Sequence, residues 1–181
     1  MSSAFVSDGV VELWPVTRAD LPRLAGWRND PEIRQRLREW RPLTDADQDT
    51  WFARISGPDR RDFMFVVRFQ QVPVGVVGLC YWNAHDATAE ISFYLGEPSA
   101  RGQGCTTRAL TLLHDWGFEE LGLERVWAEA YSFNEPSIGV LAKLGYREEG
   151  RLRSHVRRHG KRHDSVMLGL LRDEWLARPR P

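Results

Sequence analysis

The chain has little cysteine, no net charge and no long apolar run, and each absence excludes a class of protein. Only Cys80 and Cys105 are present, without a metal-type spacing, which favours a reducing compartment but leaves one disulfide possible. Lys+Arg 25 balances Asp+Glu 25, so no overall field attracts nucleic acid or an anionic membrane. No apolar run approaches the roughly 20 residues that span a bilayer. We therefore expect no nucleic-acid or membrane partner.

Several sequence signals for other arrangements are missing as well. The first ten residues lack the basic and apolar regions of a secretory signal, which favours a cytoplasmic location. The chain has no GxxxxGK[ST] sequence and no GxGxxG early in a βαβ unit, so nucleoside-triphosphatase and dinucleotide sites are disfavoured. No repeat or long linker interrupts it. We predict one domain over residues 1–181, with 1–9 as a flexible N-terminus and 176–181 as a C-terminal tail.

Hydrophobic periodicity predicts helices mixed with strands. A short strand over Val10 to Trp14 precedes three helices that begin after the capping residues Thr17, Asp30 and Thr44. Two β-rich runs after Phe63 meet at the polar pair Gln70-Gln71 and predict a hairpin, and TAEISFYLG alternates as a third strand.

The second half of the chain continues the mixture. We expect a helix from about Cys105 to Leu121, the strand ERVWAEAY, and a helix capped by Asn134 and ended by Gly145. Two strands around His159-Gly160 and a short helix that holds Glu174 and Trp175 close the chain. A largely antiparallel sheet with helices makes the fold α+β.

The turn Arg101-Gly102-Gln103-Gly104 carries the clearest chemical signal. It follows a strand and leads directly into a helix, whose first N–H groups and dipole favour an anion. Two glycines let the backbone approach a ligand closely, Arg101 adds a cation, and Thr106 or Thr107 could add a hydroxyl. Taken alone, this sequence fits a plain structural turn as well as it fits a phosphate site.

The surrounding sequence narrows the choice of ligand. AEISFYLGEPSARGQGCTTRAL, RVWAEAY and NEPSIGVLAKLGYREEG together resemble the GCN5-related N-acetyltransferase (GNAT) family, from about Val10 to Trp175. The branch resembled is that of ribosomal-protein N-terminal (RimJ/RimL-like) and spermidine acetyltransferases. The resemblance implies a central sheet of about seven strands, in which a splayed strand pair holds acetyl-CoA. Thr106 departs from the family loop, which usually has Gly or Ala there.

The resemblance also implies a mechanism of direct acetyl transfer to a primary amine. Glu90 is the expected base, unless it is only a half-buried strand residue paired to an arginine. A backbone N–H of Tyr94 or Leu95 is expected to stabilise the oxyanion. Ser137 is the expected acid for the departing thiolate, unless its hydroxyl only bonds backbone at a helix start. The remaining expected cofactor contacts come from the same strand, the loop and the later helix: Phe93, Tyr94, Leu95, Arg101, Gly102, Gln103, Gly104, Cys105, Thr106, Thr107, Asn134 and Ser137.

The amine acceptor is a small molecule or a peptide, and the sequence does not choose between them. WRNDPEIRQRL resembles the start of a helix in several small-molecule and nucleotide-sugar acetyltransferases, so Trp27, Arg28, Asn29 and Arg34 could line the acceptor pocket. Trp82 is a further expected acceptor residue. Arg34 and Arg36 fit a solvated helix face better. A monomer and a homodimer both remain open, and so does a non-catalytic acyl-CoA-binding domain of the same fold.

The closing segment SHVRRHGKRH is basic and contains three histidines at intervals of four. It could attract an acidic peptide, a phosphorylated sugar or RNA, but such a run of charges is more often simply a solvated hairpin. His155, His159 and His163 would share one face of a helix, but Gly160 and the strand pattern place a turn between them. We therefore expect no metal site.

Overall fold

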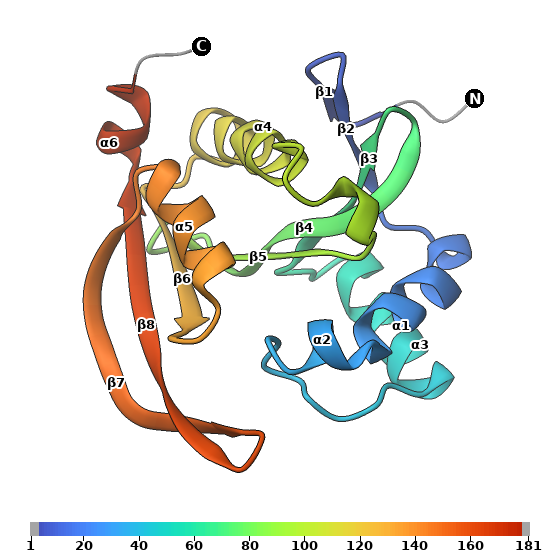
Figure 1. The fold of residues 1–181 in the computed structure, drawn as a ribbon. Coiled ribbons are helices and arrows are strands. Elements are labelled where there is room, and N and C mark those ends of the chain that lie inside the picture. The colour runs from blue at the N-terminus through green and yellow to red at the C-terminus, as the bar shows by residue number, and fades with distance from the viewer. Residues whose placement is uncertain (1–3, 179–181) are drawn as a thin grey trace. The chain divides into compact units, whose positions relative to one another are not determined.

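The computed structural model describes residues 4–178, and a mostly antiparallel sheet of eight strands is its central element (Figure 1). The strands follow the order β1-β2-β3-β4-β5-β6-β8-β7. Their bounds are β1 Val6–Ser7, β2 Val11–Pro15, β3 Phe63–Phe69, β4 Val72–Asn83, β5 Thr88–Leu95, β6 Arg125–Tyr131, β7 Arg147–Arg158 and β8 Lys161–Leu171. The predicted α+β class is confirmed, and positions 1–3 and 179–181 of the expected termini lie outside the described residues.

Six α-helices accompany these strands in the part of the chain that the structure describes. They are α1 Leu21–Asn29, α2 Pro31–Arg34, α3 Asp45–Ser56, α4 Cys105–Glu119, α5 Glu135–Lys143 and α6 Arg172–Leu176. The helix predicted to reach Leu121 ends at Glu119, because the chain turns through Gly122 at φ 73° and the Leu123 N–H bonds back to the Gly117 carbonyl.

The eighth strand is the short β1, which lies within residues 1–9, where we predicted a flexible N-terminus and no strand. The Phe5 N–H donates to the Leu13 carbonyl over 2.8 Å, and the Phe5 ring stacks on Phe65 with ring centroids 5.0 Å apart. Backbone pairing and aromatic stacking together hold this short segment against β2. Periodicity cannot indicate a strand of two residues.

Local capping agrees with the predicted starts of α2 and α3, whereas Thr17 caps a 3-10 turn over Arg18–Asp20 and α1 begins after it, at Leu21. The Asp30 carboxylate accepts the Glu32 N–H over 2.7 Å at the start of α2. Thr44 and Asp47 form the capping box of α3, with the Thr44 N–H donating to Asp47 over 2.8 Å. The hairpin between β3 and β4 turns at Gln70 and Gln71, and both residues have positive φ, 51° and 66°.

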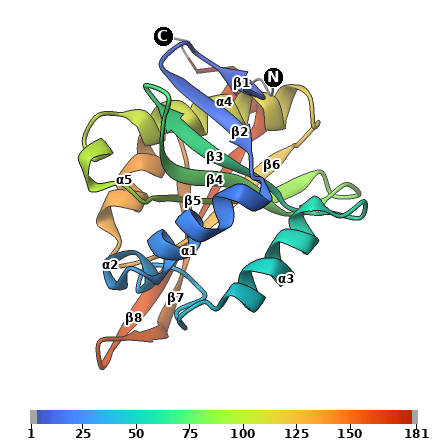
Figure 2. The same cartoon turned by 90° about the vertical axis from the view of Figure 1, so that its right-hand side faces the viewer.

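The chain divides into two compact units. The first comprises the chain up to Cys80 together with Ser92–His114, and the second comprises Tyr81–Ile91 together with the chain from Asp115 onward. In the first unit, α1, α2 and α3 gather beside the strands (Figure 2). Their contact buries a cluster of apolar side chains from both layers: Leu24, Trp27, Ile33, Val66 and Val76. This cluster places the end of β5 in the same unit.

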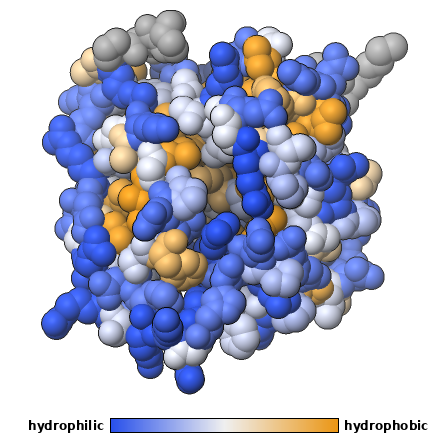
Figure 3. Space-filling view, in the orientation of Figure 1, coloured by the Kyte–Doolittle hydropathy of each residue, from blue (hydrophilic) through white to orange (hydrophobic). Residues whose placement is uncertain are grey.

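The second unit is built around β6, β8 and β7. On one sheet face Val126, Ala128, Leu168 and Leu170 are almost completely buried. The opposite face carries Glu129, which pairs with Met167 of β8. The β7–β8 hairpin continues as a mainly exposed ribbon. Its lower end is hydrophilic on the surface seen in Figure 3.

Candidate active site

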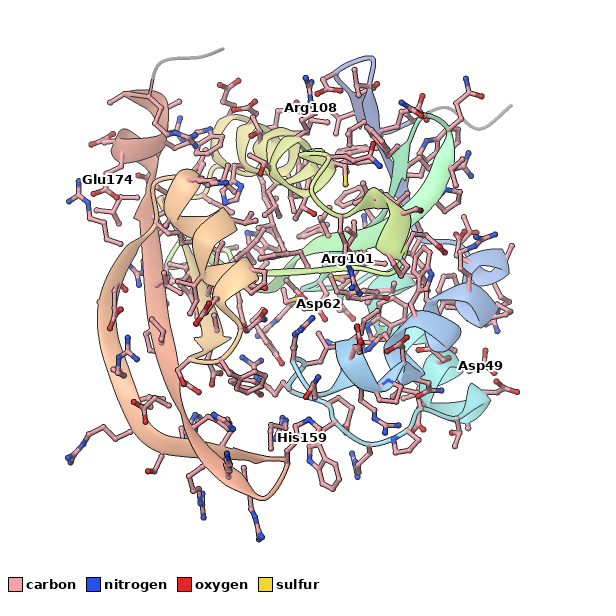
Figure 4. The ribbon with its side chains drawn as sticks, in the orientation of Figure 1. Asp49, Asp62, Arg101, Arg108, His159 and Glu174 are labelled. Carbon is pink, nitrogen blue, oxygen red and sulfur yellow. The ribbon has the colours of Figure 1, made fainter. Side chains whose placement is uncertain are left out.

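The loop between β5 and α4 has the backbone shape that an anion cradle needs. Gly102 and Gly104 both adopt φ of +74°, a left-handed conformation that residues with a side chain rarely adopt. A Cβ at either position would meet no atom within 4 Å, so the backbone faces open space. Arg101, labelled in Figure 4, is exposed beside them and lies 3.6 Å from Glu32 of α2. The residues present therefore fit a phosphate group.

The start of α4 adds unpaired backbone donors to this loop. The Arg108 N–H donates to the Gly104 carbonyl over 3.1 Å, which begins the helical ladder. The N–H groups before it have no partner in the ladder, and the positive end of the helix dipole lies behind them. The Gln103 side chain bonds the Ser99 carbonyl over 2.5 Å and steadies the turn. The loop can thus bind a pyrophosphate through backbone and dipole.

Cys105 contributes backbone, and its thiol points inward. The side chain is buried, and its Sγ donates to the Ala100 carbonyl over 3.3 Å. Burial raises the pKa of the Cys105 thiol, so it stays protonated and unreactive. Thr106 and Thr107 are partly exposed in the first turn of α4, where a hydroxyl contact with a ligand stays a prediction.

The end of β5 is supported by Trp27. The Trp27 ring is in edge contact with Tyr94, with centroids 6.5 Å apart, and its indole N–H donates to Glu97 over 2.9 Å. Trp27 is only 8% exposed and belongs to the buried cluster. Burial raises the pKa of the Tyr94 hydroxyl, while the nearby Arg28 guanidinium lowers it. The structure thus places Trp27 as a support, and its contact with an acceptor stays a prediction.

The last three residues of β5 are Phe93, Tyr94 and Leu95, and all three are partly exposed. Gly75 of β4 lies directly beside this stretch, because a Cβ there would lie 2.5 Å from the Tyr94 carbonyl oxygen. The Val74 carbonyl accepts the Gly96 N–H over 2.8 Å. The predicted oxyanion donor, Leu95, therefore lies on a strand end that is held firmly by its neighbour.

Arg28 and Asn29 follow Trp27 at the end of α1 and have different surroundings. The Asn29 amide both donates to the Leu43 carbonyl, over 3.0 Å, and accepts its N–H, over 2.7 Å. It closes the segment between them as a loop. In contrast, the Arg28 Nε is buried and has no hydrogen-bond partner. Among the predicted acceptor residues, Arg28 thus has a hydrogen-bond donor, its Nε, that a ligand could use.

The second unit holds Glu90 and Trp82. Glu90 is 7% exposed and pairs with Trp127 where β5 and β6 run parallel, from Thr88 with Arg125 to Glu90 with Trp127. Both strands continue beyond this pairing, as expected of a strand pair that separates. Trp82, partly buried at the end of β4, stays a predicted acceptor contact.

Asn134 and Ser137 lie at the start of α5 in the same unit. Asn134 occupies the N-cap position, but its side chain makes no capping bond, so the predicted side-chain cap is wrong. Its backbone carbonyl accepts the Ser137 N–H over 3.1 Å instead. Asn134 as a whole residue is buried, 8% exposed. The Ser137 hydroxyl has no hydrogen bond within residues 4–178, unlike that of Thr50, which bonds the Ala46 carbonyl over 2.8 Å. Contacts of these two side chains with a ligand stay predictions.

The three hairpin histidines have separate surroundings. His155 lies on β7, His159 at the turn with φ 48° (Figure 4), and His163 on β8 against Phe133, with ring centroids 4.6 Å apart. Over the described range 4–178, no three His, Cys, Asp or Glu side chains form a group able to hold a metal. None of its helices is long and apolar enough to cross a membrane.

Comparison with known proteins agrees with this geometry. Residues 11–147 match the family model described as an acetyltransferase (GNAT) domain. The chain belongs to the GNAT family. It is therefore an acetyltransferase with the GNAT fold, as the loop and its neighbouring strands predict. The N-acetyltransferase p20 of Bacillus licheniformis, itself uncharacterized, is 29% identical over 162 residues, which cover 86% of this chain and 89% of that protein.

Two further GNAT proteins carry names that specify a substrate. The spermidine N(1)-acetyltransferase of Escherichia coli (strain K12) is 29% identical over 119 residues, 66% of this chain and 63% of that one. The crystal structure of the Vibrio cholerae spermidine N-acetyltransferase in complex with CoA and spermine superposes with a TM-score of 0.83. Its identity is 22%, and the match covers 93% of this chain and 99% of that one. This last likeness shows the fold.

Sequence reasoning missed the support around the cofactor loop. Gly96 and Glu97, which hold Trp27, received no role. The sequence marks the dipeptide that follows Leu95 only as a turn signal. Nothing in the sequence connects Glu97 with an indole 70 positions earlier. Such long-range contacts become visible only in the folded chain.

Proposed function

We propose that this chain transfers the acetyl group of acetyl-CoA to a primary amine on a molecule that also carries a negative charge. The observation that carries the cofactor part is the pair of left-handed glycines, Gly102 and Gly104, which face open space at the start of α4. Backbone N–H groups and Arg101 would hold the pyrophosphate there. The CoA in the Vibrio cholerae complex supports this choice among phosphate ligands.

The residues of the chain would then divide the chemistry among them. Acetyl-CoA supplies an activated thioester when bound. Glu90 accepts a proton from the ammonium group, since only the neutral amine can attack. The Leu95 N–H donates to the carbonyl oxygen as negative charge develops on it. The Ser137 hydroxyl donates to the departing sulfur, and the Asn134 amide contacts the cofactor.

The charge of the described segment from Arg28 to Arg41 supports an anionic acceptor. It contains five arginines and three acidic residues. The acids are already engaged: Asp30 caps α2 over 2.7 Å, Glu32 lies 3.6 Å from Arg101, and Glu39 binds Arg41 over 2.7 Å. The positive charge that is left over comes from arginines beside the end of β5 and on α2.

Three of those arginines have unused hydrogen-bonding capacity. Arg28 has the buried Nε without a partner, and a buried donor left unsatisfied is destabilising by about 1–3 kcal/mol. Arg34 and Arg36 have no ion-pair partner within the described chain. A carboxylate or phosphate on the acceptor would satisfy these groups, often through two parallel bonds. A polyamine would be repelled by the same charges, in contrast to the acceptor named for the spermidine acetyltransferases.

An acceptor panel tests this function. Thiol release from acetyl-CoA would be followed with spermidine, an acidic amino acid, amino-sugar phosphate, and peptides whose second residue is Asp or Lys. We expect kcat/KM to be at least about tenfold higher for the anionic amines than for spermidine, and for the Asp peptide than for the Lys peptide. Arg28→Gln should narrow that difference while leaving the KM for acetyl-CoA unchanged. Preference for spermidine would contradict the anionic acceptor, and cofactor binding without turnover on any amine would favour a non-catalytic domain.

A further inference from the structure

Three polar side chains from three neighbouring strands meet on one face of the second unit. The His155 Nδ1 of β7 lies 2.8 Å from the Ser165 Oγ of β8 and 3.2 Å from the Glu129 Oε1 of β6. Ser165 is completely buried, and the Glu129 side chain is 12% exposed, whereas the His155 side chain is 47% exposed. The imidazole therefore bridges a shielded carboxylate and the solvent.

An irregularity in β7 is what brings His155 to this face. Leu152 pairs with Ser165 and Val156 pairs with His163, so β7 contains two residues more than β8 over this stretch. By strict alternation, residue 155 would point to the face opposite that of Leu152 and Ser165. Ser154, at a left-handed φ of 52°, reverses the direction of the next side chain.

The surroundings of the bulge hold this conformation. The Asp164 carboxylate accepts the Ser154 N–H over 2.8 Å, and Arg162 donates to the Ser154 carbonyl over 3.3 Å. Arg151 lies 4.0 Å from Asp164. Glu129 is thus the charged group that contacts the imidazole itself, whereas the charges from β7 and β8 fix the backbone beside it. The strained backbone of Ser154 is held by several hydrogen bonds, which indicates that the orientation of the His155 side chain has a function.

Glu129 determines which imidazole nitrogen carries the proton. A carboxylate favours a donor, so in the neutral ring the proton lies on Nδ1, which leaves Nε2 as the acceptor. Within residues 4–178 the Nε2 atom has no hydrogen bond. A base oriented by a carboxylate, with its second nitrogen open to solvent, is the arrangement of a general base or a proton relay.

The same sheet face carries Glu90. Glu90 pairs with Trp127 in the parallel register, and paired residues point to the same side of a sheet. Trp127 and Glu129 are two residues apart on β6, so their side chains also share that side. Glu90 is 7% exposed, and a buried acid that is protonated in each turnover needs a path by which to lose its proton. Glu129 is the diagonal neighbour of Glu90 across β5 and β6, and His155 contacts Glu129 over 3.2 Å.

We propose that His155 is the proton relay of this face, with Glu129 as its positioning residue. This assignment rests on the proposed function, in which Glu90 first takes the amine proton. Nε2 of His155 then accepts that proton through water and passes it to the solvent.

The step is balanced in atoms and charge. An ammonium group loses one proton to Glu90, and the resulting amine forms a C–N bond while the C–S bond of the thioester breaks. The second nitrogen proton is lost as the amide forms, and the sulfur leaves with one proton. One proton per turnover therefore has to reach solvent, and this is the proton that His155 carries.

Chemical rescue tests the relay. We expect His155→Gln to lower kcat by about tenfold or more at low buffer concentration, with the KM for acetyl-CoA unchanged. Added imidazole should restore most of the kcat, because a free base replaces the missing one. His159→Gln, in the same hairpin, is the matched control and should turn over like the wild type in every buffer. A loss that imidazole does not restore, or no loss at all, overturns the relay.

A second measurement does not depend on turnover. In ¹⁵N NMR of the wild type, His155 should show the tautomer protonated on Nδ1, and Glu129→Gln should give a mixture of tautomers. An unchanged spectrum in that variant overturns the role of Glu129. If the wild type acetylates amines and His155→Gln matches it, only the relay fails. Absence of turnover in the wild type with every amine overturns the proposed function and the relay together.

Discussion

The indole of Trp27 packs directly onto the backbone of Gly96. A Cβ at Gly96 would overlap three atoms of the indole ring, so only glycine fits there. The indole N–H is bonded to Glu97, the next residue, over 2.9 Å. Helix α1 thus holds the turn that leads from β5 to the cofactor loop, and the position of this loop depends on packing in the first unit.

Replacement of Gly96 should therefore weaken both stability and cofactor binding. We expect Gly96→Ala to lower the free energy of unfolding by about 1–3 kcal/mol, because the ring must move away. Acetyl-CoA affinity should fall as the end of β5 shifts, as measured by isothermal titration calorimetry. Gly26→Ala, in α1, is the control: a Cβ there meets nothing within 4 Å, and helix propensity should raise stability by about 1 kcal/mol. Equal stability in both variants would contradict the packing argument.

The cofactor loop can be tested with a matched pair of glycines. Gly104→Glu places a carboxylate where the backbone is expected to meet phosphate, and we expect at least a hundredfold loss of CoA affinity. Gly122→Glu introduces the same charge at nearly the same φ, 73° against 74°, beyond the end of α4. Both variants should lose a similar amount of stability to backbone strain, about 1–2 kcal/mol. Equal CoA affinity in the two variants would disprove the phosphate site.

The predictions from sequence succeeded where a local pattern decides the structure. The Thr44–Asp47 capping box, the Asp30 cap and the turn before α4 each depend on a few adjacent residues, and each is present. The helix after Asn134 is also present, although the Asn134 side chain does not form the cap. There the Asn134 backbone carbonyl accepts the Ser137 N–H over 3.1 Å.

Contacts that depend on the folded chain could not be predicted. Asn29 fits a pocket residue by its sequence neighbours, yet its amide is used by the Leu43 backbone. The alternation of β7 assigns His155 to the opposite sheet face, because the bulge at Ser154 has no signature in the sequence. In both cases the decisive partner is ten or more positions away, beyond the range of periodicity.

The amide of Asn29 provides a graded test of the loop that it closes. Asn29→Asp keeps the acceptor for the Leu43 N–H but turns an oxygen toward the Leu43 carbonyl, and Asn29→Ala removes both bonds. We expect the KM for the acceptor amine to rise in both variants, with little change in the KM for acetyl-CoA. Steady-state kinetics with each substrate varied in turn would show this split. A rise in the KM for acetyl-CoA alone would contradict a role on the acceptor side.

The Ser137 hydroxyl can be removed without loss of a structural bond. Because it has no hydrogen bond in the described chain, Ser137→Ala should leave the melting temperature unchanged within about 2 °C. If the hydroxyl assists the departing thiolate, kcat should fall by roughly tenfold. The loss should shrink with an acetyl thioester whose thiol is more acidic. Thr50→Ala, which removes a hydroxyl bonded to the Ala46 carbonyl, should leave kcat unchanged and serves as the control.

The Arg125–Glu149 ion pair should make the stability of the second unit depend on pH. The Arg125 guanidinium, bound through two bonds, holds the pKa of Glu149 below its ordinary value, and the pair lies directly over Gly169. Since the folded pKa is the lower one, the stabilisation is complete above the unfolded pKa of about 4.3 and is lost as the pH falls through the folded value. Both side chains are about one third exposed, so the contribution is at most about 1 kcal/mol.

Glu149→Gln should therefore melt a few degrees below the wild type at pH 7, and the difference should diminish below pH 4.3 and in high salt. A difference in melting temperature that stays constant from pH 7 to pH 3 would show that the pair stabilises the sheet by packing and not by charge.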